Sequence, residues 1–400
     1  MNNIGIVTTW FERGASYVSK NFKELLEGNG SNVFIYARGG DHDVSNSEYW
    51  NEDNVTIGKR WGGTFISLSH IINWIESNRI NILFFNEQTD MLIVAQIKRK
   101  LPKLKIGTYV DYYTMDTIPH FKIYDFIITN TLRHYQVFKA LEQVYYIPWG
   151  TDVNVYKPRV IERSNNEVIF FHSAGMSDRK GTQILLDSFI KYKIYLSAKL
   201  VIHAQKKINK ITSYSKEELE MIGIEVIEKT VSAPGLYHRG DVYVYPTKLD
   251  GLGLTIYEAL SCGLPVIATD VAPMTDIIKP EENIGKLVRV ESTYCRSDGY
   301  YWPMTDCSVE DLAIKMQFYI DNIQDLDYYK SCARNYAVQN LNWNDRKQVI
   351  SSIFFESRAL DFDHITYNNI RLYSRRIRFK QLYHSLKLYK FRWFIDKILP

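Results

Sequence analysis

The residues Val242-Tyr-Val-Tyr-Pro246, Asp250-Gly-Leu-Gly-Leu-Thr-Ile-Tyr-Glu258 and Leu264-Pro-Val-Ile-Ala268 decide the fold. Val242 to Tyr245 is a β-branched and aromatic run ended by proline, which predicts a buried strand. Thr255 to Cys262 predicts a helix that stops at Gly263, and Pro265 to Ala268 predicts a second strand. The intervening turn therefore lies between a strand's carboxyl end and a helix's amino end. In an open parallel sheet this is where ligands bind, because free backbone N–H groups and the positive end of the helix dipole point outward together.

The turn carries groups that suit a sugar nucleotide. Gly251 and Gly253 have no Cβ, so the backbone there can approach a bulky anion. Asp250 and Glu258, at its two ends, can accept hydrogen bonds from hydroxyls. The competing interpretation is an ordinary strand-turn-helix with a solvated Asp and Glu, and the turn alone does not decide between the two.

Length and composition set the general class. A chain of 400 residues with 46% hydrophobic content can bury two ordinary cores. Its four cysteines form no Cys-x-x-Cys pair, which favours a reduced, cytoplasmic protein without a disulfide framework or a zinc site. We expect neither a secretory signal nor a membrane span, since no apolar run approaches the roughly 20 residues that a spanning helix needs.

The first half of the chain alternates strands with helical periodicity. We predict strands over residues 4–8, 33–36, 80–85, 105–110, 125–129 and 145–149, and helices over 15–26, 66–75, 91–97 and 133–141. Such alternation predicts a doubly wound sheet with right-handed crossovers. The turn from Trp10 to Ala15 has Gly14 before a helix and is the first-half counterpart of the Asp250–Gly253 turn.

A second alternating series follows a linker over residues 150–166. It comprises strands over 168–172, 199–203 and 225–228, and helices over 182–192 and 216–221. We therefore predict two doubly wound domains, 1–152 and 153–341, a crossover helix over 342–363 and a tail over 364–400. A cleft between the domains is the default site.

Two adjacent cations open the second series. Arg179-Lys180-Gly181 follows a strand and precedes a helix. An Arg can fork two phosphate oxygens while a Lys acts as a point charge, so the pair suits a diphosphate. The alternative is a solvated basic loop.

Three motifs together resemble the retaining GT-B glycosyltransferases of family GT4, the glycosyl transferases group 1. Ile147-Pro-Trp-Gly-Thr-Asp152 with Tyr156-Lys-Pro158 is similar to the sequence that opens the family's second domain. Lys180-Gly181 is similar to its phosphate loop, and Asp250 to Glu258 resembles its E-x7-E segment. The motifs lie in family order, and the similarity spans roughly residues 3–357.

The resemblance implies a GT-B fold and a nucleoside-diphosphate sugar, UDP- or GDP-linked, as co-substrate, with no other cofactor and no metal. Glu258 would take the ribose hydroxyls, Gly253 to Thr255 would offer backbone N–H groups, and Asp250 would hold a sugar hydroxyl. The candidate catalytic residues are Arg179, Lys180, Asp250 and Asp111, and the candidate donor-binding residues are Gly14, Gly181, Gly251, Gly253, Leu254, Thr255 and Glu258.

This sequence departs from the family pattern at several positions. The first acid of E-x7-E is Asp250, one methylene shorter than the usual Glu. Gly175 stands where the family commonly has an Arg, so Arg179 would take its place. Asp111-Tyr112-Tyr113 follows the strand after which the family usually shows a His. We interpret His172, Cys262 and Trp149 as packing residues.

The carboxyl-terminal tail is strongly basic. Residues 370–400 hold nine Lys or Arg against one acid, whereas the whole chain has a net charge of +4, so the body is acidic on balance. Phe379, Leu382, Leu386, Tyr389 and Trp393 fall at helical spacing. A basic amphipathic helix with aromatic residues is typical of anionic membrane surfaces. The alternative is a helix that packs its apolar stripe on the body or on a second copy.

We therefore expect a cytoplasmic, membrane-peripheral, retaining transferase that extends a surface polysaccharide, glycolipid or glycoprotein glycan. Its acceptor would be a glycan, a lipid-linked sugar or a protein. One rival is a soluble transferase with a small-molecule or protein acceptor. Another is a non-catalytic relative that binds a nucleotide or glycan or scaffolds a partner transferase. We expect no nucleic-acid partner, because the body is acidic and no nucleic-acid module is present.

Overall fold

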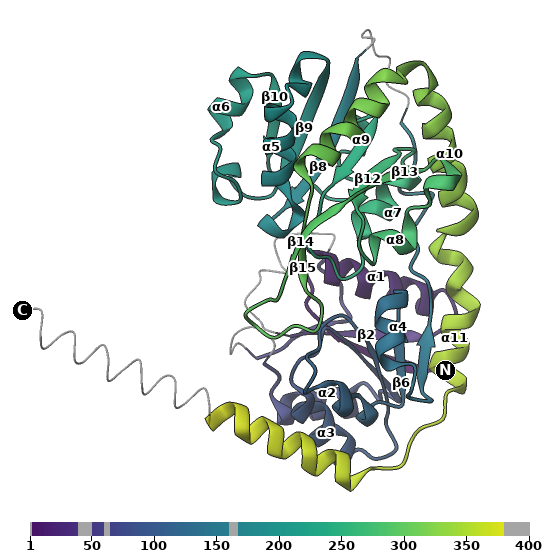
Figure 1. Cartoon of the computed structure of the whole chain (residues 1–400). Helices are drawn as coiled ribbons and strands as arrows, with labels where there is room; N and C mark the ends of the chain where they lie inside the picture. The colour runs from purple at the N-terminus through teal and green to yellow at the C-terminus, as the bar shows by residue number, and fades with distance from the viewer. Residues whose placement is uncertain (1, 39–49, 60–64, 160–166, 380–400) are drawn as a thin grey trace, which may run out of the picture.

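The computed structural model describes residues 2–38, 50–59, 65–159 and 167–379, which build two sheets, one above the other in Figure 1. The lower sheet has seven parallel strands in the order β3-β2-β1-β4-β5-β6-β7. Their bounds are β1 Asn3–Thr8, β2 Asn32–Ala37, β3 Val55–Ile57, β4 Ile82–Asn86, β5 Lys105–Tyr109, β6 Phe126–Thr129 and β7 Val144–Tyr146. The first strand lies inside the sheet and the chain winds outward to both edges, as in doubly wound folds.

The upper sheet has six parallel strands in the order β10-β9-β8-β11-β12-β13. They are β8 Val168–Gly175, β9 Ala198–Ala204, β10 Ile224–Glu228, β11 Val242–Tyr245, β12 Val266–Thr269 and β13 Gly285–Val288. The predicted architecture of two doubly wound sheets is confirmed. The predicted boundary between residues 152 and 153 stays a prediction, within the stretch between the end of β7 and the start of β8.

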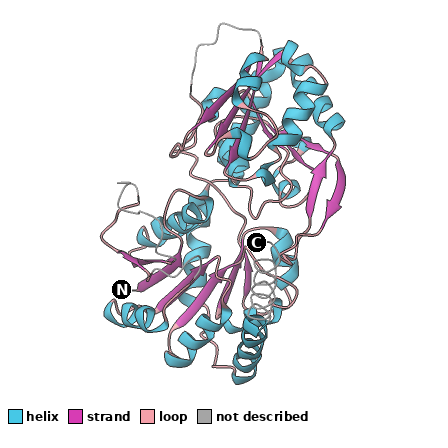
Figure 2. Cartoon of the chain, turned by 90° about the vertical axis from the view of Figure 1, so that its left-hand side faces the viewer, coloured by secondary structure: helices cyan, strands magenta, loops and turns pink. Residues whose placement is uncertain are grey.

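Helices cover both faces of each sheet (Figure 2). In the first domain α1 (Gly14–Glu27) and α11 (Lys347–Glu356) pack on one face and α2 (Leu68–Ser77) and α3 (Met91–Lys100) on the other. Side chains alternate between faces along a strand. Accordingly, Ile6 joins the α1 side and Val7 the α2 side. The short α4 (Leu132–Phe138) follows β6.

The second domain repeats this arrangement. Helices α7 (Leu254–Ser261) and α10 (Leu326–Asn340) contribute to the core on one face of its sheet. Helices α5 (Thr182–Lys191), α6 (Lys216–Met221) and α9 (Val309–Asp321) contribute on the other. The remaining short helix, α8 (Met274–Ile277), follows β12. The cluster on the α7 face also contains the α1 and α11 side chains of the first domain, so one hydrophobic core runs through both domains.

Two crossings of the chain join the domains side by side. The Thr151 N–H donates to the Leu341 carbonyl at 2.7 Å, and the Trp343 N–H donates to the Thr151 carbonyl at 2.9 Å. The Trp149 and Trp343 rings lie 4.2 Å apart between centroids and are both buried. This packing explains why the strand predicted to reach Trp149 ends at Tyr146. The Ile147 N–H still donates to the Thr129 carbonyl of β6 at 2.9 Å, and Pro148 and Trp149 then leave the sheet for the junction.

A hairpin extends from the second domain toward the first. Its strands, β14 (Val290–Tyr294) and β15 (Met304–Cys307), pair antiparallel, and Figure 1 shows it descending between the two sheets, away from α10 and α11. No hairpin was predicted from the sequence. Asp298-Gly299 is a turn signal, but nine residues separate the two strands, more than the two to five of a recognisable hairpin loop.

The chain ends, as far as the structure describes it, in a helix over residues 364–379. Tyr367 and Ile370 on this helix are buried against the first domain. The predicted stripe from Leu382 to Trp393 lies outside the described residues. Among the helices that the structure does describe, none combines the length and apolarity of a membrane span.

Candidate active site

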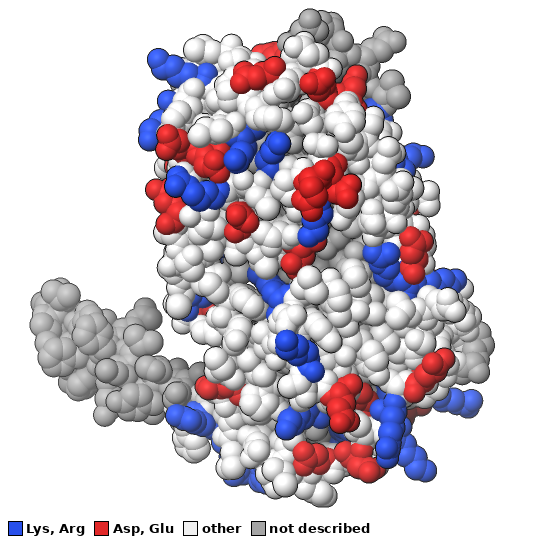
Figure 3. Space-filling model, turned by 45° about the vertical axis from the view of Figure 1, so that its right-hand side comes forward, with Lys and Arg blue, Asp and Glu red and all other residues white. Residues whose placement is uncertain are grey.

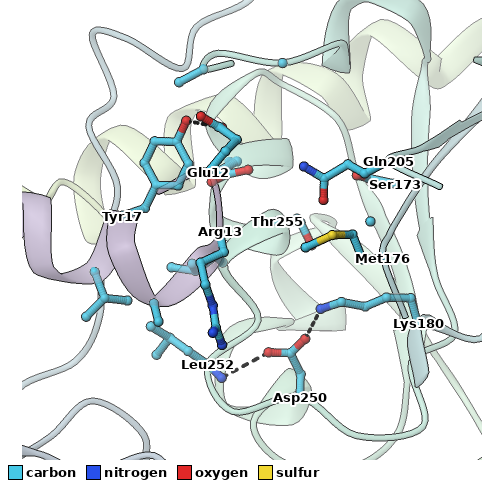
Figure 4. Close-up of a pocket in the computed structure, with 18 of the residues that line it drawn as sticks. Glu12, Arg13, Tyr17, Ser173, Met176, Lys180, Gln205, Asp250, Leu252 and Thr255 are labelled. Atoms are coloured by element: carbon cyan, nitrogen blue, oxygen red, sulfur yellow. Dashed lines mark hydrogen bonds and ion pairs between the residues drawn. The ribbon is translucent and has the colours of Figure 1, made fainter. Parts of the chain in front are cut away.

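The Asp250–Gly253 turn is shaped by the Asp250 side chain. One carboxylate oxygen accepts the N–H groups of Leu252 at 3.1 Å and Gly253 at 2.8 Å. The other accepts the Lys180 ammonium (Figure 4) and the Tyr245 hydroxyl. Burial alone would raise the pKa of the Asp250 carboxyl, but Lys180 and these hydrogen bonds hold it well below its usual range. All four lone-pair positions of the carboxylate are therefore occupied.

Gly253 allows this turn to run into α7. It lies in the left-handed region at φ 77°, a conformation that L-residues with a Cβ avoid, and caps the helix. The first backbone N–H groups of α7 have no intrahelical partners and carry the positive end of the helix dipole. Leu254 and Thr255, at the start of the helix, line a cavity.

Lys180 reaches the same turn from β8. It lies in a short 3-10 helix, Asp178–Lys180, followed by Gly181 at φ 77°. A Cβ at Gly181 would come within 1.8 Å of the Pro246 carbonyl, so the loop packs directly against the end of β11. The adjacent Arg179 also lines the cavity, whereas Gly181 and Gly253 support the loops without facing it.

Glu258 lies one helical turn further along α7. Its carboxylate accepts the Tyr237 hydroxyl. Burial raises the pKa of Glu258, while the hydrogen-bonding Tyr237 and Tyr156 hydroxyls act in the opposite direction. Glu258 is thus an acid enclosed by hydroxyl donors at the cavity wall, a setting that suits further hydroxyls better than cations.

Asp111 belongs to the first domain but touches the turn of the second. It follows β5, and a Cβ placed on Gly251 would lie 2.0 Å from its Oδ1. Burial raises the pKa of Asp111 to about 7, with further contributions from the charges of Glu87 and Asp250, against the opposing effect of Arg133. Gly251 is therefore the residue that lets an acid of one domain approach the backbone of the other.

These groups line one cavity of about 400 Å³ between the domains. Of the candidate residues it is lined by Gly14, Asp111, Arg179, Lys180, Asp250, Gly251, Leu254, Thr255 and Glu258. Figure 4 shows Arg13 pointing from the first domain toward the turn at Leu252 and Asp250. Within the described part of the chain, no three His, Cys, Asp or Glu side chains are grouped to hold a metal ion.

The sequence interpretation missed several cavity residues, above all Glu12 and Glu87. Glu12 accepts hydrogen bonds from the Tyr17 hydroxyl and from the Trp50 indole, the latter at 3.1 Å. Glu87 directly follows β4 and holds φ 53°, which is uncommon for a residue with a side chain. Both acids come shortly after strands of the parallel sheet, and that position was the available signal.

The packing interpretations agree with the structure. His172 is fully buried and bonds the Val244 carbonyl at 2.7 Å and the Thr182 hydroxyl at 2.9 Å. Burial lowers the pKa of His172 to about 4, so it is neutral at pH 7. Burial raises the pKa of the Cys262 thiol to about 12, which keeps it unreactive.

Sequence comparison shows which family this part of the chain resembles. Residues 166–294 match the family model described as glycosyl transferases group 1. The predicted resemblance to the group 1 glycosyl transferases is confirmed. The group 1 match covers β8, the Lys180 loop, the Asp250–Gly253 turn and α7, and it ends at Tyr294, within the hairpin.

Individual relatives and solved structures are similar to this chain beyond the segment that matches the family model. A probable sucrose-phosphate synthase of Thermosipho melanesiensis is 23% identical over 236 residues, 54% of this chain and 51% of the relative. The chain spans about half the length of the first curated relatives it matches.

Two solved structures share the fold. A sucrose-phosphate synthase from Thermosynechococcus elongatus has a TM-score of 0.69 at 14% identity, covering 89% of this chain and 99% of that one. Anabaena Alr3699/HepE, solved with UDP and glucose, has a TM-score of 0.66 at 15% identity, covering 88% and 98%. The fold of this chain is therefore GT-B.

Proposed function

We propose that the protein is a retaining glycosyltransferase of family GT4 that transfers a sugar from a nucleoside-diphosphate sugar to a hydroxyl acceptor. We propose that the acceptor is a glycan, glycolipid or glycoprotein in surface polysaccharide or glycoconjugate synthesis. A UDP-sugar is the first donor to test, because the HepE structure of the same fold contains UDP and glucose. GDP-sugars are the alternative.

One observation carries this proposal: a single cavity is lined by the adjacent cations Arg179 and Lys180, the start of a helix and a hydroxyl-binding acid. Arg179 and Lys180 lie beside the first residues of α7, and Glu258 lies one turn further in. Cations and free N–H groups suit a diphosphate, and a carboxylate surrounded by hydroxyls suits a ribose. We assign Gly253, Leu254 and Thr255 to the sugar and diphosphate, and Glu258 to the ribose.

Lys180 connects donor binding to catalysis. In the structure it is paired with Asp250, whose lone pairs are all used. A diphosphate that draws Lys180 away would free one oxygen of Asp250 for a sugar hydroxyl. Negative charge then grows on the diphosphate as the glycosidic bond breaks, and Arg179 and Lys180 stabilise it. Such groups lower the barrier because they bind the transition state more strongly than the ground state.

Asp111 would act on the acceptor side. It lies against Gly251 of the turn and near Glu87, and with a pKa of about 7 it changes charge in the physiological range. In the ionised form it can accept a hydrogen bond from the attacking hydroxyl. Gly14 and the neighbouring Glu12 line the same cavity from the first domain, and we keep Gly14 as a donor-binding residue.

We further propose that the protein acts in the cytoplasm at the inner face of the membrane, and that the domain limits are those predicted from the sequence. The described helix 364–379 exposes Arg371, Arg375, Arg376 and Arg378.

On the face shown in Figure 3, basic and acidic side chains are interspersed over both domains, with no single basic patch of the kind that nucleic acid requires.

The alternative is a non-catalytic protein that binds a nucleotide or glycan or scaffolds a partner transferase, and the Lys180–Asp250 ion pair, which occupies the turn, favours it. A thermal-shift screen of UDP- and GDP-sugars followed by transfer and hydrolysis assays separates the two. A sugar nucleotide that raises the melting temperature and is consumed supports catalysis. Binding without consumption supports the alternative. No binding by any sugar nucleotide contradicts the donor-site assignment and leaves only glycan binding or scaffolding.

A further inference from the structure

The hairpin is fixed to the donor turn of its own domain. The Thr305 N–H of β15 donates to the Lys248 carbonyl at 2.8 Å, and the Lys248 ammonium pairs with Asp306 at 2.9 Å. Lys248 lies two residues before Asp250. The part of the hairpin beyond Tyr294 falls outside the group 1 family match, so its tip is a feature of this chain to be explained from its own contacts.

The tip binds residues 111–113 of the first domain, which begin two positions after the end of β5. The Tyr300 hydroxyl donates to the Asp111 carbonyl at 3.0 Å, and the Tyr301 N–H donates to the Tyr113 carbonyl at 3.0 Å. The Trp302 indole N–H donates to the Tyr113 hydroxyl at 2.6 Å. Second-domain residues therefore hold the backbone on both sides of Tyr112, beginning at Asp111.

A chain of hydrogen bonds continues from Tyr113 back to the donor turn. Its hydroxyl lies 2.8 Å from Nδ1 of His134, and Nε2 of His134 lies 3.4 Å from the Gly251 carbonyl. An indole N–H can only donate and a carbonyl can only accept. Tyr113 therefore accepts from Trp302 and donates to His134, which carries its proton on Nε2.

The surroundings favour this neutral form of His134. The ring is fully buried, and burial, followed by the Arg133 charge, lowers its pKa well below the usual value. A neutral imidazole has one donor and one acceptor, which are the two roles that this series of hydrogen bonds requires of His134. Every bond between Trp302 and Gly251 thus has a single consistent direction.

Arg133 makes a parallel connection. Its guanidinium donates to the Ala272 carbonyl at 2.7 Å and to the Asp250 carbonyl, and it lies 5.4 Å from the centre of the Trp302 ring. Both connections begin at Trp302 of the second domain. They pass through the first domain, one by Tyr113 and His134 and the other by Arg133. Both end at the donor turn of the second domain, at Gly251 and Asp250.

We infer that the hairpin tip, Tyr300 to Trp302, is an interdomain strap that fixes Asp111 against the donor turn through Tyr113 and His134, which act as positioning residues. The two crossings of the chain join the domains on the α10–α11 side, and the strap joins them on another side of the site (Figure 1). The roles of Asp111 and the turn rest on the proposed function, whereas the strap itself rests on the contacts.

The decisive variant is Tyr113→Phe, which keeps the ring but removes the hydroxyl that joins Trp302 to His134. The matched control is Tyr301→Phe, because the bond from Tyr301 to the first domain is made by its backbone N–H. We expect Tyr113→Phe to lower kcat at least about tenfold, since small misplacements of reacting groups cost up to roughly a hundredfold. UDP affinity should stay within about twofold, because Lys180 and Glu258 are outside the chain of hydrogen bonds.

Two readouts do not need turnover. Amide hydrogen exchange of residues 111–113 and 250–253 in the full-length chain should rise in Tyr113→Phe and Trp302→Phe and stay unchanged in Tyr301→Phe. The imidazole nitrogen signals of His134 should show the Nε2–H tautomer in the wild type and lose that preference in Tyr113→Phe.

The outcomes separate the strap from the proposed function. If the wild type transfers no sugar but both exchange and His134 signals change as expected, the strap stands and the function fails. If Tyr113→Phe matches Tyr301→Phe in exchange and in kcat, the strap is wrong. It is also wrong if kcat, UDP affinity and melting temperature fall together, because that result indicates general destabilisation.

Discussion

Asp111 shows how one residue can differ from the family that the chain resembles and still titrate in the same range. The resemblance leads one to expect a His here, whose ordinary pKa is about 6.5. Burial and the charges of Glu87 and Asp250 bring the pKa of Asp111 to about 7. The imidazole would lose a positive charge as the pH rises, whereas the carboxyl gains a negative one. The proton is available in the same pH range, but the carboxyl is one unit more negative than the imidazole in each protonation state.

The stability of the protein should depend on pH through Asp111. Its folded pKa lies above the unfolded value, so the contribution to the free energy of unfolding is complete below about pH 4 and is lost as the pH rises toward 7. Glu87, Asp250, Arg133, Tyr109 and Tyr300 face this group. We expect Asp111→Asn to lose less stability than the wild type between pH 5 and pH 8 in urea denaturation.

The matched control for this prediction is Asp116→Asn, since Asp116 is an exposed acid five residues away. Asp116→Asn should follow the wild-type curve. An Asp111→Asn curve parallel to the wild type over the same pH range would contradict the assignment of the titration to Asp111.

Donor binding should depend on Glu258 and Lys180. Loss of a hydrogen bond to a charged group costs roughly 1.5 to 3 kcal/mol, or about ten- to a hundredfold in affinity. Calorimetry with UDP or the identified sugar nucleotide on Glu258→Gln and Lys180→Ala measures this. Lys210→Ala, at an exposed lysine of the same domain, serves as the control. Unchanged affinity in both site variants would show that the nucleotide binds elsewhere.

The diphosphate should need no divalent ion. Arg179 and Lys180 can supply two positive charges at the cavity wall, the compensation that other transferases obtain from a metal. We expect EDTA to leave most of the transfer rate intact in assays of the purified protein. A rate that collapses in EDTA and returns with magnesium or manganese would mean that the two cations do not suffice.

At the scale of elements, the Lys180 loop and the end of β11 are held in contact by a glycine. Gly181 combines a φ of 77° with a Cβ position 1.8 Å from the Pro246 carbonyl. Gly223 shares the unusual backbone, at φ 84°, but has nothing within 4 Å of its Cβ position. The two positions therefore separate backbone strain from steric clash.

Gly181→Ala should destabilise the protein more than Gly223→Ala. The left-handed conformation alone costs roughly 1–2 kcal/mol with a Cβ present, and we expect about that loss at Gly223. Gly181→Ala adds displacement of the loop, so its urea midpoint should fall further and UDP affinity should fall with it. Equal midpoints in the two variants would indicate that the loop moves away from Pro246 without cost.

At the scale of the whole molecule, the tail helix 364–379 has two distinct faces. Tyr367 and Ile370 pack on the first domain, while Ile365, Leu372 and Phe379 recur every seven residues and are 73%, 62% and 71% exposed. Residues seven apart lie on one face of a helix. The exposed apolar stripe lies beside arginines, an arrangement typical of helices at anionic membrane surfaces.

The tail should bind anionic vesicles. Each basic residue near such a surface contributes about 1 kcal/mol, and the contribution is screened over about 8 Å at physiological ionic strength. We expect the full chain to sediment with anionic but not neutral vesicles, and high salt to release it. Arg375→Glu with Arg376→Glu should abolish binding, whereas Lys191→Glu with Lys193→Glu, on the second domain, should not.

Ending the chain at Asp363 would be a poor test, because it removes the buried Tyr367 and Ile370. A chain ending at Phe379 keeps them and tests the remaining tail alone. If the full chain ignores anionic vesicles, or if the double arginine variant instead dissociates an oligomer, the helix is a protein-packing element and the membrane proposal is wrong.

The sequence by itself determined the two sheets and the residues that line the second-domain half of the cavity. Parallel strands buried on both faces are short apolar runs, and the loops at their carboxyl ends carry glycines, cations and acids at spacings that can be read locally. Lys180, the Asp250–Gly253 turn and Glu258 lie within a single domain and were identified for that reason. Glu87 carried the same local signal, because it directly follows the strand β4, but it was not predicted.

Only the tertiary structure decided how the two domains meet. The contact of Asp111 with Gly251, the hairpin tip on Tyr113, and the saturation of Asp250 by Lys180 and Tyr245 join residues from about 5 to 190 positions apart in the chain. Such contacts are made by side chains reaching across packed elements, and neither periodicity nor local motifs encode them. They depend on the relative placement of the sheets, which the shared hydrophobic core and the two crossings fix only once the chain has folded.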